Sequence, residues 1–471
     1  MIRSKLSNGR ARAFGFRDKL GYLLGDFGND FTFILSSTFL LKFYTDVMGV
    51  DAYIVGIVMM VARFVDAFTD VTMGRICDKA KVRPSGKYKP WILRMAVPVA
   101  ISSFLMYQSS LRDAPLAMKV AWLSVTYILW GSVFYTSINI PYGSMASAIS
   151  REPSDRQSLS TYRTMGGTLA GVIIGGGIPL FVYKQIEVDG RIVTALDGFA
   201  FTVVAGVMSV LAILAYVGCY LLSTERVVSE PSAHHKSGGA LSLLTRAVKN
   251  RALISIIFAS IFMLLSQLTM QGMSNYIYPN YYNSAGAMSV STLAMMGAML
   301  IAASVAKPLA RRIGKAEVSA ISNILAAAIC FALFIIRPAS VWVYVFIQFL
   351  CWLGLGIFSM VSWALITDVI DYSELKYGVR EDGSIYALYS FARKLGQAAA
   401  SGLTGALLSY IGYSDKTAYD RVVLERVYDI STVLPAIGFA SLALILFFWY
   451  PLRKKVVDKN VRLLKEKHGE I

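Results

Sequence analysis

Histidine and cysteine are both scarce in this sequence, with 3 and 4 residues among 471. No histidine falls in a long apolar segment, which excludes a histidine proton relay inside a membrane. The cysteines show no metal-site or disulfide spacing, so we interpret them as small apolar residues in packed helices. A Gly-rich phosphate loop, a nucleophile elbow and a His/Cys ligand cluster are also missing. These absences argue against an ATP-driven pump and against an enzyme, and no cofactor is predicted.

Acidic residues are few compared with basic ones, at 29 Asp and Glu against 46 Lys and Arg, and the formal net charge is +17. In a soluble protein this excess would suggest nucleic-acid binding. Here most basic residues lie in short stretches between apolar runs, where anionic lipid and the positive-inside rule explain them better. The predicted partners therefore include membrane lipid and exclude nucleic acid.

Long apolar runs are what the sequence has in excess. Its hydrophobic fraction is 56%, against about 45–50% in soluble chains. A helix of about 20 apolar residues is long enough to cross the ~30 Å hydrocarbon core. We therefore predict an all-α membrane protein with twelve transmembrane helices, at residues 27–45, 52–77, 90–110, 120–149, 159–183, 198–222, 252–278, 288–310, 316–336, 340–369, 384–412 and 430–451.

The basic residues also predict the orientation of these helices. With both termini inside, the inside segments hold 30 of the 46 Lys and Arg and the outside loops hold 8. An excess of this size follows the positive-inside rule. The basic N-terminal stretch lacks a small-residue cleavage site, so we interpret it as a cytoplasmic tail and not as a cleaved signal peptide.

A polar stretch at residues 223–251 divides the chain into two six-helix bundles, residues 1–222 and 252–451, followed by a cytoplasmic tail at 452–471. A weak internal repeat supports this division, because short basic turns end the second helix of each half. Two six-helix halves joined by a cytoplasmic loop fit a rocker architecture, with substrate bound at the midplane between the halves.

Two carboxylates in the second predicted helix are the strongest functional signal. Asp66 and Asp70 are four residues apart and share one helix face. Carboxylates in low dielectric repel each other, and a proton, a Na⁺ ion or an arginine relieves that repulsion. The pattern favours a cation site; the alternative is a structural network with Arg63 and Arg163, since an intramembrane charge needs a partner or a function.

Other polar residues lie in the first and fourth predicted helices. Asp30, about one turn into the first, is either an acceptor for substrate hydroxyls or a helix-start residue favoured by the helix dipole. In the fourth, Tyr135, Thr136 and Asn139 offer polar atoms on nearby turns, and Pro141 permits a kink.

Three residues in the first, tenth and eleventh predicted helices remain to be considered. Lys394, in the middle of the eleventh helix beside Arg393, is expected to pair with a buried carboxylate or an anionic substrate. Trp363 is interpreted either as a stacking surface for a sugar or as an ordinary core or lipid-facing residue. Lys42, near the outer end of the first helix, is expected to reach back to water.

Ordered motifs run along nearly the whole chain, including GDFGNDF at 25–31, ARFVDAFTD at 62–70, GKYKPW at 86–91, TYILWG at 126–131 and WAL at 363–365. They resemble the glycoside–pentoside–hexuronide:cation symporters of the major facilitator superfamily, typified by the melibiose carrier. The resemblance implies the major facilitator fold, symport of a sugar, glycoside or hexuronide with Na⁺ or H⁺, and a multi-pass location in a bacterial-type inner (plasma) membrane.

The resemblance also implies roles for individual residues. The family's cation site matches Asp66, Asp70, Thr69 and Thr136, and its sugar-binding carboxylate matches Asp30. Arg163 and Lys394 match positions close to both sites. With Na⁺ as the coupling ion, Asp66 and Asp70 would be its ligands. The predicted substrate contacts are thus Asp30, Asn139, Tyr135, Arg163, Trp363 and Lys394.

The sequence departs from the melibiose carrier in the fourth helix. An Asp and a Trp that hold the galactoside are replaced by Asn139 and Gly143, so melibiose is not the expected sugar. The segment around Asn139 looks more like the glucuronide carriers, and two cations in helix eleven would suit a carboxylated sugar, whereas Asp30 disfavours one. The coupling ion stays open, with Na⁺ slightly favoured over H⁺. A cation-coupled lysolipid carrier is the alternative function, because the fold does not fix the substrate.

Overall fold

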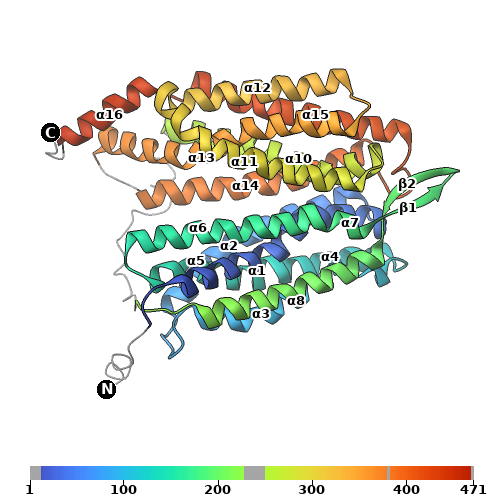
Figure 1. Cartoon of the computed structure of the whole chain (residues 1–471), viewed down its shortest axis with the longest axis horizontal. Helices are drawn as coiled ribbons and strands as arrows, with labels where there is room; N and C mark the ends of the chain where they lie inside the picture. Colours follow the sequence, from blue (N-terminus) through green and yellow to red (C-terminus); the bar gives the residue numbers. More distant parts are fainter. Residues whose placement is uncertain (1–11, 228–249, 379–381, 468–471) are drawn as a thin grey trace. The chain divides into compact units, whose positions relative to one another are not determined.

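The structure is a computed structural model that describes residues 12–227, 250–378 and 382–467. The described residues are almost entirely helical and form two compact units. The first contains α1 to α8 and the second contains α10 to α16 (Figure 1). Most of the predicted central loop, residues 223–251, lies outside the described part.

The first unit follows the predicted order of helices. Three π-helical segments extend or join its α-helices: η1 (Phe43–Val47) follows α1, η3 (Leu129–Tyr135) joins α4 to α5, and η4 (Val172–Gly177) joins α6 to α7. Its α-helices are α1 (Phe16–Lys42), α2 (Ala52–Lys79), α3 (Lys89–Leu105), α4 (Leu116–Ile128), α5 (Thr136–Ile149), α6 (Pro153–Gly171), α7 (Pro179–Val182) and α8 (Gly198–Leu222).

The second unit consists of α10 (Arg251–Tyr276), α11 (Ala285–Ile313), α12 (Lys315–Ile336), α13 (Val341–Tyr377), α14 (Asp382–Tyr410), α15 (Arg421–Leu444) and α16 (Lys454–Lys467). The π-helical segments η5 (Ile277–Tyr281) and η6 (Ile445–Trp449) extend α10 and α15. The apolar core of the unit is formed mainly by α10, α12, α13 and α15. The helix α16 occupies most of the predicted tail.

Nine helical rods of the described chain are long and apolar enough to cross a membrane. The helices α1, α2 and α14 have 27, 28 and 29 residues but carry the intramembrane charges that lower their hydropathy. Counting these three, the described residues form a set of long rods that fits the twelve predicted spans, and the predicted all-α membrane fold is confirmed.

Capping side chains mark the start of several of these helices. Asp51 accepts a hydrogen bond of 2.8 Å from the backbone N–H of Tyr53 at the start of α2, and Asp420 accepts one of 2.9 Å from Val422 at the start of α15. Such residues satisfy N–H groups that have no partner inside the helix. They therefore help to define where α2 and α15 begin.

The first helix begins earlier than predicted, at Phe16 and not at residue 27. Asp18 in its first turn accepts a hydrogen bond of 3.2 Å from the backbone N–H of Gly15. Because charged residues fill the first turns, the apolar pattern alone placed the start too late. Asp30 therefore lies in the middle of α1, about 21 Å along its axis from the start, and the interpretation as a helix-start residue is wrong.

A β-hairpin follows α7, where the sequence predicted only an outside loop. β1 (Tyr183–Val188) pairs antiparallel with β2 (Arg191–Leu196), and the hairpin projects beyond the helix ends of the first unit (Figure 1). Asp189 and Gly190 form its turn with φ of 50° and 74°. Asp-Gly is a preferred pair for a two-residue hairpin turn, because both positions need positive φ.

Candidate substrate and cation site

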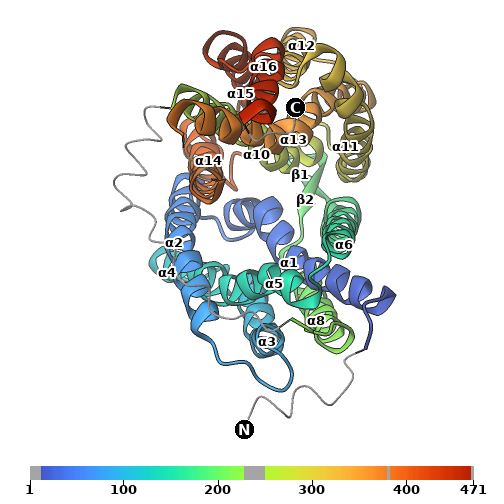
Figure 2. The same cartoon turned by 90° about the vertical axis from the view of Figure 1, so that its left-hand side faces the viewer.

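The first helix of the first unit carries one half of the candidate site. It packs against α6 and α8 (Figure 2). Close approach to α6 depends on Gly166, because a Cβ there would lie 2.4 Å from the Leu23 carbonyl oxygen. This packing brings Arg163 of α6 to Asp26 of α1, where its Nε donates a hydrogen bond of 2.9 Å to Oδ1.

Asp26 is a site residue that the sequence prediction missed. It lies just before residue 27, where the first span was predicted to begin, so it was not counted among the intramembrane charges. The guanidinium of Arg163 also lies over the ring of Tyr142, 5.4 Å from its centroid. Arg163 therefore contacts α1 and α5, and in the described part of the chain it does not form the alternative pairing with Asp66 and Asp70.

Asp30 lies one turn after Asp26 and is half-buried. Its carboxylate lies over Gly167 of α6, where a Cβ would be 2.4 Å from Asp30 Oδ2 and 3.1 Å from Asp26 Oδ2. Within the described chain, Asp30 makes no hydrogen bond or ion pair, whereas Asp26 has Arg163. Asp30 is thus a carboxylate whose acceptor capacity is available to a ligand.

The second half of the site is formed by α2 and the rod η3–α5. Ser132 donates a hydrogen bond of 2.5 Å to Asp66 Oδ1, and Thr136 donates one of 2.8 Å to Asp70 Oδ1. The two carboxylates are four residues apart on α2, and the two hydroxyls are four residues apart on the neighbouring rod. Each rod thus presents its two groups on one face, and each carboxylate meets one hydroxyl. The sequence prediction named Thr136 but missed Ser132, whose place depends on the π-helical turn of η3.

Arg63 joins this group from one turn earlier on α2. Its Nη1 lies 3.4 Å from Asp66 Oδ2, and its guanidinium lies 4.9 Å from the ring centroid of Phe33 on α1. The ring of Phe33 in turn stacks on Tyr135, with centroids 5.8 Å apart. The predicted network between Arg63 and Asp66 is therefore present. Through Arg63, the candidate cation ligands are linked to the stacked rings of Phe33 and Tyr135.

Two further predicted residues lie beside this group without joining its side-chain contacts. Thr69 Oγ1 donates to the backbone oxygen of Asp66 at 3.2 Å, so its hydroxyl lies against its own helix. Asn139 is half-buried on α5, one turn after Tyr135. No hydrogen bond joins Asn139 to either carboxylate group in the part of the chain that the structure describes.

The chemistry of this unit suits a small hard cation and a polyol. Two carboxylates and two hydroxyls at Asp66, Asp70, Ser132 and Thr136 supply the oxygen ligands that such cations prefer. No group of three or more His, Cys, Asp or Glu side chains among the described residues is placed to hold a metal ion. A bound cation would therefore depend on hydroxyl oxygens as well as carboxylates.

The second unit carries an aromatic cluster around Trp363 of α13. Its ring stacks on Tyr386 of α14, with centroids 4.8 Å apart, and meets Tyr389 edge-on at 5.1 Å. The guanidinium of Arg393 lies 5.6 Å from the Trp363 ring centroid. Trp363 is 40% exposed, so this cluster does not cover it completely. Lys394, the next residue on α14, is half-buried.

Comparison with known proteins decides the family. Residues 21–454 match the family described as MFS/sugar transport protein. The chain belongs to this family. The predicted resemblance to the glycoside–pentoside–hexuronide symporters is confirmed, and the chain is a transporter and not an enzyme.

Curated relatives of this sugar-transport family member cover nearly all of it. It is 30% identical to the isoprimeverose transporter of Lactiplantibacillus pentosus, over 96% of this chain and 92% of the relative. It is 29% identical to the glucuronide carrier protein homolog of Escherichia coli strain K12, over 93% of each. It is 28% identical to the putative sulfoquinovose importer of the same strain, over 93% of this chain and 91% of the relative.

Solved structures share the fold of this family member at low sequence identity. A bacterial homologue of the human lysosomal transporter Spinster, inward-facing and unoccupied, has a TM-score of 0.70 and 11% identity, covering 95% of this chain and 99% of that one. The D-xylose–proton symporter has a TM-score of 0.63 and 12% identity, covering 93% and 98%. The predicted major facilitator fold is thereby confirmed.

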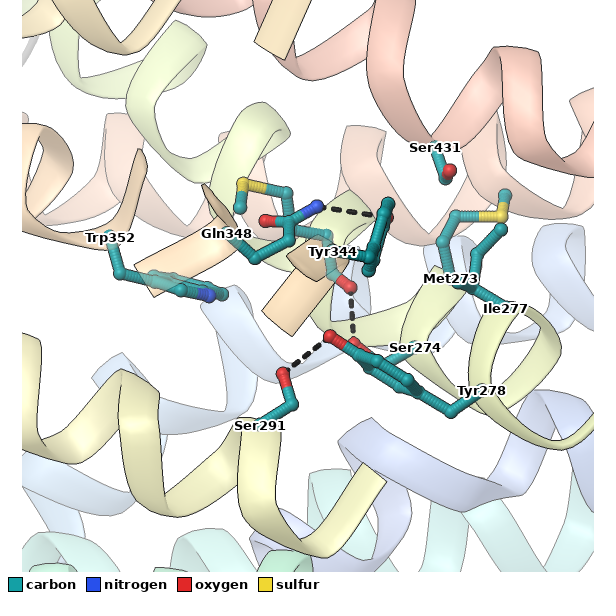
Figure 3. A pocket seen from close by; sticks show the side chains of 10 residues that line it. Met273, Ser274, Ile277, Tyr278, Ser291, Tyr344, Gln348, Trp352 and Ser431 are labelled. Carbon is teal, nitrogen blue, oxygen red and sulfur yellow. Dashed lines mark hydrogen bonds between the residues drawn. The ribbon is translucent and has the colours of Figure 1, made fainter. Parts of the chain in front are cut away.

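A small enclosed cavity in the second unit of the transporter is too small for a sugar. Tyr278 donates a hydrogen bond of 2.6 Å to Ser291, and Gln348 donates one of 2.9 Å to Tyr344 (Figure 3). The Oε1 of Gln348 is buried without a partner. The cavity of about 10 Å³ has the size of one water molecule, which would satisfy that oxygen.

The prediction for Lys42 in the first helix was wrong. Lys42 was expected to reach back to water, but its side chain is only 1% exposed and lies 2.5 Å from Asp46 Oδ2. A counter-charge one turn later removes the need to reach the surface, because a paired ammonium is tolerated in a buried position. The pair lies where α1 passes into η1.

Proposed function

We propose that this transporter moves a sugar or glycoside across a bacterial plasma membrane together with a cation, Na⁺ or H⁺. The observation that carries the proposal is the division of carboxylates in the first unit. Asp66 and Asp70 are each bound by a hydroxyl of the neighbouring rod, whereas Asp30, on another helix, is available as an acceptor. One ligand is thus a cation and the other a molecule with hydroxyl donors.

The cation is proposed to bind between Asp66 and Asp70. Na⁺ would take carboxylate oxygens together with the hydroxyls of Thr136 and Ser132, and a proton would neutralise one of the two carboxylates. The Thr69 hydroxyl donates its proton to the Asp66 backbone oxygen, so only its oxygen lone pairs are proposed to contribute to a bound Na⁺. Arg63, at 3.4 Å, relieves part of the charge of Asp66 when no cation is present.

The sugar is proposed to bind Asp30 through its hydroxyls. A carboxylate accepts two hydroxyl hydrogen bonds side by side, which suits neighbouring hydroxyls on a sugar ring. Tyr135 and Asn139 would add hydrogen bonds to the sugar from the adjacent rod. Arg163 pairs with Asp26, so that the charge of Asp26 is compensated next to Asp30. Trp363 and Lys394 of the second unit stay proposed substrate contacts, Trp363 through the exposed part of its side chain.

Coupling follows from the cost of leaving a buried charge without a partner. A carrier loaded with only one ligand keeps carboxylates exposed to low dielectric when it changes conformation, which is unfavourable. The doubly loaded form is therefore proposed to switch between inward and outward access, and the empty form is proposed to switch with Arg63 compensating part of the charge of Asp66. Both termini are proposed to lie in the cytoplasm, as the distribution of basic residues predicts.

The names of the relatives support a carbohydrate substrate. The three relatives are named for isoprimeverose, a glucuronide and sulfoquinovose. Both neutral and acidic compounds are among them, so the panel of test substrates needs both. The lysolipid alternative is not favoured by these names.

Uptake into sealed membrane vesicles tests the proposal. A panel of labelled neutral glycosides and uronides is applied with a Na⁺ gradient or an H⁺ gradient imposed separately. We expect accumulation of at least one sugar with one of the two gradients. The absence of accumulation with every sugar under both gradients would contradict the proposal.

Substitution of the carboxylates tests the cation site. Asp66→Asn and Asp70→Asn each remove one charge at nearly constant volume, and we expect both to reduce accumulation to the level seen without a gradient. The control is Asp113→Asn, which changes an exposed carboxylate outside the long helices and should leave accumulation unchanged. Accumulation that survives both site substitutions would assign the cation elsewhere.

A further inference from the structure

A second cavity lies in the second unit, away from the aromatic cluster. The helices α11, α13 and α16, together with Lys315 of α12, line an open pocket of about 680 Å³, within the range of ligand pockets. Small and apolar side chains form most of its wall: Ala303, Ala306, Ala310, Met360, Val361, Ala364, Leu452, Val457 and Val461.

The acidic residues of this pocket are already paired. Lys315 lies 2.6 Å from Asp368, and Lys454 lies 3.1 Å from Asp458. These two ion pairs cancel four of the six charges that line the pocket. The remaining two are both positive and belong to α11.

Lys307 and Arg311 are these remaining charges. They are four residues apart and so point from one face of α11. Neither has an acidic partner within ion-pair distance in residues 12–227, 250–378 and 382–467. Two adjacent cations beside an apolar cavity match a ligand that has an anionic head and an apolar chain.

We propose that this pocket binds an anionic glycerophospholipid of the cytoplasmic leaflet. Its phosphate lies between Lys307 and Arg311, and one acyl chain follows the alanine-rich wall of α11. Phosphate is a strong partner for both side chains. The last turns of α11 belong to the end that the basic residues predict to be cytoplasmic, where basic pockets between helices bind anionic head groups.

Asp368 favours a lipid whose head group carries hydroxyl donors. This residue lines the pocket and is 7% exposed, and its Oδ2 is buried without a hydrogen-bond partner. A buried acceptor of this kind is costly unless a donor reaches it. Phosphatidylglycerol carries both the phosphate for the cations and hydroxyls for Asp368.

The bound lipid would also hold the tail helix in place. The helix α16 supplies Val457 and Val461 to the pocket wall. It is joined to the unit by a hydrogen bond of 2.9 Å from the Lys454 N–H to Glu317 and by an ion pair of 3.4 Å between Lys467 and Glu374. A lipid chain between α11 and α16 adds apolar contact to these polar ones.

Native mass spectrometry of the full-length protein in detergent tests the site. We expect dioleoylphosphatidylglycerol to bind more tightly than dioleoylphosphatidylcholine. Lys307→Gln with Arg311→Gln should weaken phosphatidylglycerol binding by at least about ten-fold, because each basic residue near a lipid head contributes substantially. The matched control is Arg312→Gln with Lys455→Gln, which removes the same charge from exposed positions outside the pocket.

Filling the apolar wall tests the acyl chain without changing charge. Ala303→Phe should reduce phosphatidylglycerol binding, whereas Ser304→Phe, at the next exposed position outside the pocket, should not. An equal loss of phosphatidylglycerol binding in the Lys307/Arg311 variant and in its Arg312/Lys455 control would overturn the proposal. The lipid would then be attracted by the overall positive charge and not by this pocket. Binding unchanged by Ala303→Phe, or displacement of the lipid by inorganic phosphate, would also overturn it. None of these readouts depends on sugar transport.

Discussion

At the scale of single residues, a glycine on α6 leaves room for the carboxylates of α1. Gly167 leaves the space in which Asp30 and Asp26 approach the helix, with Asp30 Oδ2 only 2.4 Å from where a Cβ would stand. The atom in contact is the end of a side chain and not backbone. A methyl group at position 167 would therefore move the carboxylate rather than separate the helices.

We expect Gly167→Ala to impair sugar binding more than folding. Because the atom in contact is a movable side-chain end, the cost to the fold should be at or below the low end of the about 1–3 kcal/mol typical of overpacking. Displacement of the proposed sugar acceptor should instead raise the KM for uptake roughly ten-fold. Thermal stability should change little. The control is Gly177→Ala, since no atom lies within 4 Å of a Cβ there. An unchanged KM in Gly167→Ala would remove Asp30 from the sugar site.

At the scale of elements, Asp197 joins the β-hairpin to α8. Its carboxylate caps the helix by accepting hydrogen bonds of 3.0 Å and 3.3 Å from the N–H groups of Phe199 and Ala200. It also forms an ion pair of 2.8 Å with Lys184 of β1. The hydrogen bond from Lys184 holds the pKa of Asp197 below its usual range, and the two backbone N–H groups of the cap lower it further.

The sign of this pKa shift predicts how stability depends on pH. Because the folded protein lowers the pKa, the interaction stabilises the fold above the unfolded value of about 3.9 and is lost as the pH falls through the lower folded pKa. Lys184 is more than half exposed, so the ion pair contributes about 1 kcal/mol or less.

Thermal unfolding of the purified protein at pH 6 and pH 3 tests this element. Asp197→Asn keeps a good N-cap but cannot ionise, so we expect the wild type to lose more stability on acidification than the variant. Other carboxylates titrate in both proteins, and their effect cancels in the difference. Equal losses would show that the pair with Lys184 does not stabilise the hairpin.

At the scale of the whole molecule, the distribution of basic residues predicts which ends lie in the cytoplasm. The four native cysteines are all buried, so an introduced surface cysteine can report its own side of the membrane. Arg191→Cys lies in the hairpin and Lys455→Cys in α16, and both positions are exposed.

We expect a membrane-impermeant maleimide to label Arg191→Cys in intact cells. Lys455→Cys should react only after the cells are permeabilised, because the predicted orientation places α16 inside. The native protein is the control for background labelling. The reverse pattern would contradict the orientation and, with it, the assignment of the lipid pocket to the cytoplasmic leaflet.

Most of the fold was predictable because transmembrane helices are local features. An apolar stretch of about 20 residues forms a helix in lipid whatever its neighbours are, since every backbone group must be satisfied within the segment. The span predicted at residues 198–222 therefore coincides with α8. The predicted start of α1 was too late because the first turns of this helix are charged. The hairpin was not predicted, although its Asp-Gly turn is present in the sequence.

The sequence by itself determined the family, the helical spans and the i, i+4 pairing of Asp66 with Asp70, because helix geometry alone puts two such residues on one face. Only the tertiary structure decided which groups those carboxylates meet. Arg163 pairs with Asp26, Ser132 reaches Asp66, and Asp30 is left available. These contacts join residues of different helices, and the packing that sets them depends on glycines and a π-helical turn whose effects are not visible in the spacing of residues along the chain.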